Sequence, residues 1–176
     1  MAGEIERLEW ADIVIVQFPL WWFRPPAILK GWLDRVLVNG FVIGVSKPGT
    51  RPWLRYGEGR LVGRRGLLAV TAGGREAQFS RRGINGPNED FLFPLDHGVF
   101  HYTGMSALEP FVTFSAARAS TPDFMDISDR YIRRLLGAPH EAPMHYRSEN
   151  GDDYDELGRL QYDVATGLDG YRPHVI

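Results

Sequence analysis

The sequence predicts an α/β fold in which helices cover both faces of a parallel sheet. Short, β-branched, apolar runs at 12–18 and 66–71 have the composition of strands that are buried on both faces. Between and after them lie segments whose apolar residues recur at the three-to-four spacing of an amphipathic helix. Ligands of such sheets bind beyond the carboxyl ends of the strands. We therefore expect any functional site in the loops that follow these strands.

The first part of the chain supplies a helix end, a strand and a complete helix. Ile5 and Leu8 lie among charged residues and indicate the last turns of a helix. After the first strand and the loop 19–25, a helix begins at Pro26, because proline is favoured in the first turn, where its missing N–H is not needed. Gly40 is the expected stop of this helix.

The remaining elements follow a long irregular segment. Residues 41–65 are rich in Gly, Pro and Arg and have no period, so we expect an excursion before the second strand. We predict a helix over 87–103 and a third strand over 108–114, with a bulge or an edge position at Pro110. A capping Thr-Pro pair begins the last helix, at 121–137.

Composition excludes several classes of function. Lys and Arg number 20 against 22 for Asp and Glu, a balance that argues against a protein whose main task is to neutralise nucleic-acid phosphates. The chain has no cysteine, which excludes disulfides, thiolate metal sites and a cysteine nucleophile. The most apolar stretch, 13–23, is about half the length of a membrane span. We therefore expect a cytoplasmic protein with no membrane insertion and no nucleic-acid partner.

The loops contain residues with two interpretations each. Trp21, Trp22 and Phe23 follow the first strand and are either a platform for a flat ring or a cap on the core or a dimer contact. Gly73 and Gly74 either allow backbone to approach a ligand or make a tight turn. A histidine pair on the helix over 87–103, His97 and His101, is four residues apart. No third ligand has a recognisable spacing, so we predict solvated or core-edge histidines and no metal site.

These motifs closely resemble the NAD(P)H:quinone oxidoreductases of the flavodoxin-like superfamily. The resemblance runs through residues 10–23, 26–36, 71–74, 83–86 and 104–110, in order and with matching spacing, and covers roughly residues 4–137. It implies a flavodoxin-like parallel sheet with helices on both faces, in which residues 1–137 form a partial domain. Residues 138–176 are then a polar C-terminal tail, which we expect to be extended or loosely ordered.

The resemblance also implies an activity. Members are NAD(P)H dehydrogenases (quinone): they bind FAD or FMN, work as homodimers with active sites at the interface, and reduce a quinone by two electrons taken as a hydride from NAD(P)H. The cofactor-binding residues implied here are Pro19, Leu20, Trp21, Trp22, Phe23, Thr71, Ala72, Gly73, Gly74 and Phe79. The implied catalytic residues are Trp22, Phe23 and Asn85.

Two departures from the family pattern affect these expectations. Phe79 and Asn85 stand where some members have a Tyr and a His that relay protons, and Asn85 can donate a hydrogen bond but cannot shuttle a proton near neutral pH. The second departure is that the family pattern starts, in this sequence, at the end of the helix before its third strand. Two βα units, on the order of 60 residues at about 30 per unit, are expected before residue 12 and are not in the sequence. The first strand is therefore expected to lie at an apolar sheet edge.

Two alternatives to the enzyme follow from the same observations. Flavodoxin-like relatives serve as regulatory subunits of potassium efflux systems, although no docking surface is identifiable here. The chain could otherwise be an inert, truncated flavoprotein fragment. In that case we expect weak or no binding of FMN and FAD, because the ring-binding loops are present and the loop that holds the phosphate is not.

Overall fold

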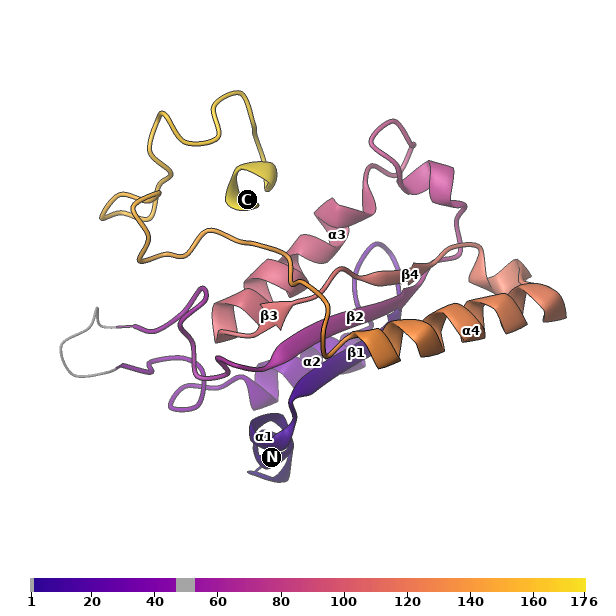
Figure 1. Cartoon of the computed structure of the whole chain (residues 1–176), viewed down its shortest axis with the longest axis horizontal. Helices are drawn as coiled ribbons and strands as arrows, with labels where there is room; N and C mark the ends of the chain where they lie inside the picture. Colours follow the sequence, from indigo (N-terminus) through magenta and orange to yellow (C-terminus); the bar gives the residue numbers. More distant parts are fainter. Residues whose placement is uncertain (1, 47–52) are drawn as a thin grey trace.

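A computed structural model describes residues 2–46 and 53–176 as an α/β structure around a four-stranded parallel sheet (Figure 1). The strands are β1 (Ile13–Pro19), β2 (Arg65–Thr71), β3 (Ser106–Ala107) and β4 (Phe111–Thr113). The helices are α1 (Ala2–Trp10), α2 (Ala27–Val36), α3 (Asn88–Leu95) and α4 (Thr121–Gly137), with shorter 3-10 helices that include η1 (Glu76–Phe79) and a π-helix η2 (Asp96–His101). In the described part of the chain, no helix is both long enough and apolar enough to cross a membrane.

Strand β2 is the centre of the sheet. It pairs in parallel with β1 along seven residue pairs, from Ile13 opposite Arg65 to Pro19 opposite Thr71, and with β3 and β4 on its other side. Among the described residues β1 has no second neighbour, so it lies at the edge that the sequence predicts. Ile15 on this strand is 44% exposed.

The third strand is shorter and more broken than predicted. A single strand over 108–114 is wrong: β3 ends at Ala107 and β4 begins at Phe111. The interruption lies at Pro110, where the sequence predicts an irregularity, because proline has no N–H to donate to the ladder. Both pieces pair with β2, so the break changes the ladder without changing the strand order.

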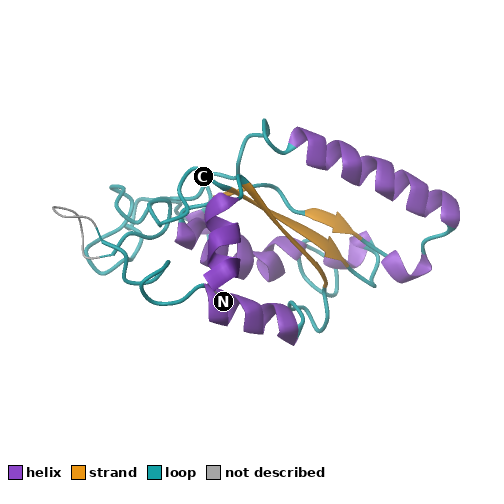
Figure 2. Cartoon of the chain, turned by 90° about the horizontal axis from the view of Figure 1, so that it is seen from below, coloured by secondary structure: helices purple, strands orange, loops and turns teal. Residues whose placement is uncertain are grey.

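The two faces of the sheet are covered unequally (Figure 2). The larger core lies between the sheet and the helices α2, α3 and η2, and includes Phe18, Val36, Leu68, Leu92 and Phe100. Helix α4 lies on the opposite face, where Leu67, Leu108 and Ala138 form a second, smaller core. The sequence predicts a buried face on α4, but no residue of this helix is fully buried, because a cavity of about 430 Å³ separates part of the helix from the sheet.

The helix predicted over 87–103 changes type along its length. It is α-helical to Leu95 and continues as the π-helix η2, from Asp96 to His101. Pro94 lies just before this change and lacks the N–H that an α-helix needs at that position. π-helical turns are rare and are frequent at functional sites.

Residues 138–176 form no long helix or strand, but they do not extend away from the domain. The segment lies beside α3 (Figure 1) and is fastened to the sheet where the Met144 N–H donates to the Ala107 carbonyl at 2.8 Å. An antiparallel bridge between Tyr146 and Val175 closes it on itself. The structure thus differs from the extended or loosely ordered tail that the sequence predicts, because half-buried apolar residues of the segment pack on the larger core.

Candidate functional site

The predicted site residues gather at the carboxyl edge of the sheet, where three strands end in register. Pro19 of β1 lies opposite Thr71 of β2, which lies opposite Thr113 of β4. The Leu20 N–H donates to the Thr71 carbonyl at 2.8 Å, and the Ala72 N–H donates to the Thr113 carbonyl at 2.8 Å. The loops that follow β1 and β2 are therefore side by side, as their place in a parallel sheet predicts.

The loop after β1 is a tight turn with an unusual backbone. The N–H groups of Trp21 and Arg24 donate to each other's carbonyls, at 3.1 and 3.0 Å. The central residues Trp22 and Phe23 have φ angles of 49° and 61°. Turns with two left-handed residues usually contain Asn and Gly, and a non-glycine residue held in this conformation costs about 1–3 kcal/mol. Such strain is typical of functional sites.

This turn sends its two aromatic side chains to different environments. Trp22 is 92% exposed. The Phe23 ring instead joins a cluster of phenylalanines, with its centroid 5.1 Å from Phe91 and 6.4 Å from Phe79. Phe79 in turn lies 5.5 Å from Phe114, the residue that follows β4. The cluster connects the loop after β1 to η1, α3 and the end of β4. It is the apolar packing that supports the loops at this edge.

The two glycines after β2 have different surroundings. A Cβ on Gly74 would lie 2.8 Å from Cε2 of Phe79, so Gly74 is required for the packing of this ring. A Cβ on Gly73 would meet no atom within 4 Å. Among the described residues, the N–H groups of both glycines, and those of Trp22 and Phe23, donate no hydrogen bond. The edge therefore offers unpaired backbone donors beside an exposed indole ring.

The turn that carries Asn85 is fastened to η1. The Asn85 N–H donates to the Gln78 carbonyl at 3.0 Å, and a Cβ on Gly83 would lie only 2.3 Å from the same carbonyl oxygen. Gly83 therefore permits the close approach that holds Asn85, which is half-buried, next to the helix of Phe79. Phe79 itself is buried, with only 6% of its surface exposed. It therefore packs beneath the loops, and its ring is not available for direct contact with a ligand.

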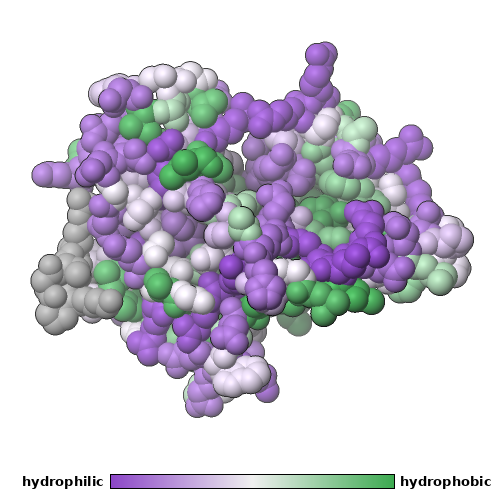
Figure 3. All heavy atoms as spheres, viewed as in Figure 1, coloured by the Kyte–Doolittle hydropathy of each residue, from purple (hydrophilic) through white to green (hydrophobic). Residues whose placement is uncertain are grey.

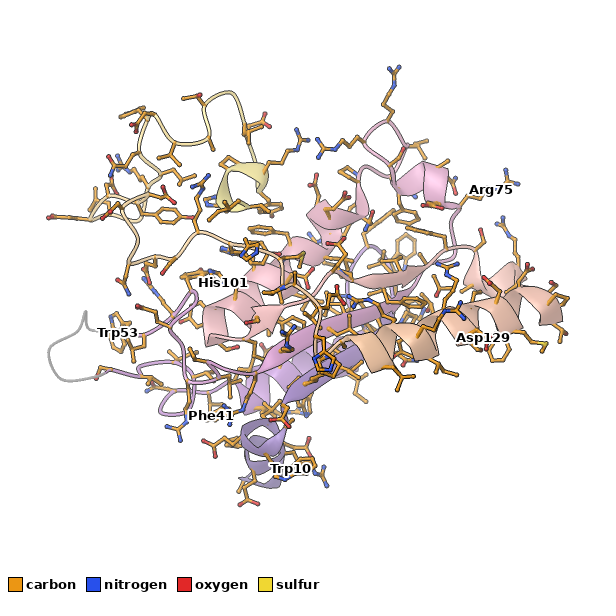
Figure 4. All side chains as sticks on the ribbon, viewed as in Figure 1. Trp10, Phe41, Trp53, Arg75, His101 and Asp129 are labelled. Atoms are coloured by element: carbon orange, nitrogen blue, oxygen red, sulfur yellow. The ribbon has the colours of Figure 1, made fainter. Side chains whose placement is uncertain are left out.

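The edge continues into open surface that carries charged side chains. Exposed arginines surround it from four segments: Arg24, Arg75, Arg81, Arg82 and Arg118. Arg75 lies on the side of the molecule opposite to Trp53 (Figure 4). Beside Thr113, a cavity of about 420 Å³ is lined by both arginine and aspartate side chains. Apolar surface gathers along α4, in the right half of the space-filling view, near this edge (Figure 3).

The predicted residues are thus brought together, and the structure adds others. Pro19, Leu20, Trp21, Trp22 and Phe23 and the segment from Thr71 to Gly74 share one edge, with Phe79 below it and Asn85 held beside η1. Phe91, Phe114 and Thr113 are additional contributors. Phe114 is the last residue of the strand predicted over 108–114, and a position at the carboxyl end of a predicted strand is a usable signal. Phe91 had none, because it reaches the cluster only through the packing of α3.

His97 and His101 lie elsewhere, at the amino end of the sheet, among Tyr56, Tyr146 and Phe93. The His97 ring stacks on Phe93 with centroids 4.5 Å apart, and burial, with smaller effects of His101 and His174, lowers the pKa of His97 to about 4. Within residues 2–46 and 53–176, no group of three or more His, Asp or Glu side chains could hold a metal ion.

Fold and edge together define a flavodoxin-like protein whose predicted site residues lie at the carboxyl ends of its strands. The chain belongs to the flavodoxin-like fold family, whose model matches residues 1–135. It is similar to the ribosyldihydronicotinamide dehydrogenase-like protein traD of Penicillium crustosum, with 45% identity over 86% of this chain and 56% of that protein. The human ribosyldihydronicotinamide dehydrogenase [quinone] is 40% identical, over 82% of this chain and 59% of the human protein.

A solved structure agrees with this assignment. A protein described as a candidate quinone reductase of Klebsiella pneumoniae superposes with a TM-score of 0.94 at 43% identity, over 99% of this chain and 68% of that chain. The resemblance to quinone oxidoreductases that the sequence shows is thus confirmed. The chain spans somewhat more than half the length of the curated relatives it matches.

Proposed function

We propose that the protein is a flavin-dependent oxidoreductase that transfers a hydride from NAD(P)H, or a related dihydronicotinamide, to a quinone. The observation that carries the proposal is the strained turn that holds Trp22 in solvent at the same sheet edge as the unpaired N–H groups of Gly73 and Gly74. A flat ring with polar atoms along one side is the ligand that such a surface fits. The names of the relatives support the same class of reaction.

The residues at the edge fit the ring of FMN or FAD. Pro19, Leu20, Trp21 and Trp22 would lie along one side of it, with the segment from Thr71 to Gly74 along the other, where the N–H groups of Gly73 and Gly74 would donate hydrogen bonds to its polar atoms. When bound, a flavin supplies a group that accepts and releases a hydride. Phe79 would not contact the flavin. It would support the binding surface indirectly, by packing against Phe23.

The chain's own side chains have separate tasks in this proposal. Trp22 and Phe23 line the place where the dihydronicotinamide and then the quinone would lie, and they provide flat apolar surface for stacking. Asn85 orients the quinone by donating a hydrogen bond. Asn85 does not titrate near neutral pH, so the proton that the reduced quinone takes up comes from water.

We further propose that the protein acts as a cytoplasmic homodimer. Exposed apolar side chains next to the edge support this: Trp21 is 62% exposed, Ile28 is 85% exposed and Ile84 is 88% exposed. A partner placed here would cover the open side of the ring-binding surface, which is what a site shared between two copies requires.

The test uses the product of the whole reading frame, purified and analysed for bound flavin. We expect about one FMN or FAD per chain, and a clearly lower occupancy in Trp22→Ala. Trp53→Ala, at the opposite end of the molecule, is the control and should keep full occupancy (Figure 4). Protein that stays colourless after incubation with excess FMN and FAD would overturn the proposal. Flavin-loaded protein without quinone turnover would instead support the regulatory-subunit alternative, which the dehydrogenase names of the relatives do not favour.

A further inference from the structure

A further cavity lies between the helical layer and the C-terminal segment, away from the carboxyl edge. Its volume is about 470 Å³. The walls come from α3 and η2, from the connection between β3 and β4, and from both arms of the folded-back segment 142–176. Apolar residues make up much of the lining, among them Phe93, Pro110 and Met144.

Asp96 is an unusual member of this lining. It is the first residue of the π-helix η2 and only 3% of it is exposed. Its Oδ1 atom is buried and has no hydrogen-bond partner among the described residues. Burying an ionised carboxylate without a partner costs on the order of several kcal/mol of folding free energy. A group of this kind calls for either a bound proton or a bound cation.

The other charged groups of the cavity favour a cation. Glu89 and Glu109 line the cavity and are exposed, so their carboxylates lie at its mouth, whereas the carboxylate of Asp96 is buried. Burial and then the charge of Glu109 raise the pKa of the Asp96 carboxyl well above its ordinary value, so a cation bound beside Asp96 is what would hold it in the ionised form. Arg134, the arginine nearest to Glu109, donates to the Glu109 carbonyl and pairs with Glu141, so its charge is already shared.

The form of the cavity indicates an organic cation. Within the described ranges no cluster of acidic and histidine side chains is close enough to enclose a metal ion, and the walls are largely apolar and aromatic. The Phe93 and Tyr146 rings, with centroids 6.1 Å apart and nearly perpendicular, provide π-faces that attract cations. We propose that this cavity binds a primary ammonium group carried on an apolar body, with the Asp96 carboxylate as its buried counter-ion.

Benzylammonium and benzyl alcohol are suitable probes because they have the same shape and differ in charge. Binding to the 176-residue chain is followed by NMR titration at pH 7.5. We expect benzylammonium to bind about tenfold or more tightly than benzyl alcohol, the ratio that one buried charge-assisted hydrogen bond supplies. Asp96→Asn has the same shape and should reduce this ratio to near one, whereas Asp129→Asn, an exposed acid on α4, should leave it unchanged.

Two further measurements keep the outcome decisive. Near-UV circular dichroism establishes that Asp96→Asn is folded. If it is not, Glu109→Gln at the mouth replaces it, with an expected reduction of the ratio that is smaller but measurable. Equal affinity for the two probes, binding of neither, or a ratio that survives both substitutions would overturn the proposal. Flavin binding at the carboxyl edge is independent of all these results.

Discussion

The ring of Phe23 lies 5.1 Å from the ring of Phe91, a residue 68 positions further along the chain. Its neighbour Trp22 remains 92% exposed in the same left-handed turn. Phe23 thus packs the turn against α3, while Trp22, the residue before it, is exposed to solvent. This division explains how the chain can keep a large apolar side chain exposed at a defined place, which is what a stacking surface for a ring requires.

The strain at Trp22 predicts an unusual order of stability between two substitutions. Trp22→Gly should be more stable than Trp22→Ala by about 1 kcal/mol, because glycine adopts a positive φ without the Cβ clash. Little packing is lost in either variant, since the side chain is exposed. Urea unfolding measures the difference.

Trp10 is the matched control for this pair. It is also exposed, at 86%, and it lies in helix α1, where φ is negative. Alanine should there be the more stable replacement, by about 0.5–1 kcal/mol, because glycine gains more chain entropy on unfolding. The same order at both positions would contradict the assignment of strain to the turn.

Gly74→Ala should destabilise the protein by about 1–3 kcal/mol, the usual effect of overpacking. The added Cβ would lie 2.8 Å from Cε2 of Phe79. Phe79→Leu removes the ring edge in question, so the double variant should lose less stability than the sum of the two single variants. Strict additivity would show that Gly74 is not required by Phe79. The equivalent change at Gly73, which faces open space, should be tolerated.

His97 predicts a dependence of stability on pH. Its folded-state pKa of about 4 lies below the unfolded value of 6.5, because the ring is buried next to His101 and His174. The unfolded chain therefore binds more protons between these pH values. The contribution of His97 is fully present above pH 6.5 and is lost as the pH falls towards 4.

Urea unfolding at several pH values tests this contribution. His97→Gln should flatten the fall in stability across that window, although the variant also loses the stacking on Phe93. His140→Gln, an exposed control, should keep the wild-type slope. A slope unchanged in His97→Gln would show that this ring is not the buried, neutral group described above.

The parts of the fold that follow local rules could be predicted from the sequence. The first two strands are displaced by no more than one residue at either end, because their β-branched, apolar runs are distinct from their surroundings. The adjacency of the loops after β1 and β2 follows from parallel pairing alone. The break at Pro110 and the change to a π-helix after Pro94 have local causes, but their extent depends on the neighbours that each segment packs against.

The parts that depend on distant packing could not be predicted. Nothing local to Trp22 and Phe23 indicates left-handed backbone, since the turn type usually needs Asn-Gly. Phe91 reaches Phe23 only because α3 lies against the loop. The cavity at Asp96 exists because residues 142–176 fold back, which their polar composition does not suggest.

Quinone-dependent oxidation of NAD(P)H or of dihydronicotinamide riboside by the flavin-supplemented product of the whole reading frame tests the central claim most directly. We predict turnover with one quinone reduced per donor oxidised, a decrease of about tenfold in kcat/KM for the quinone in Trp22→Ala, and wild-type rates in Trp53→Ala. Absence of turnover with every donor and quinone, or full activity in Trp22→Ala, would contradict the account.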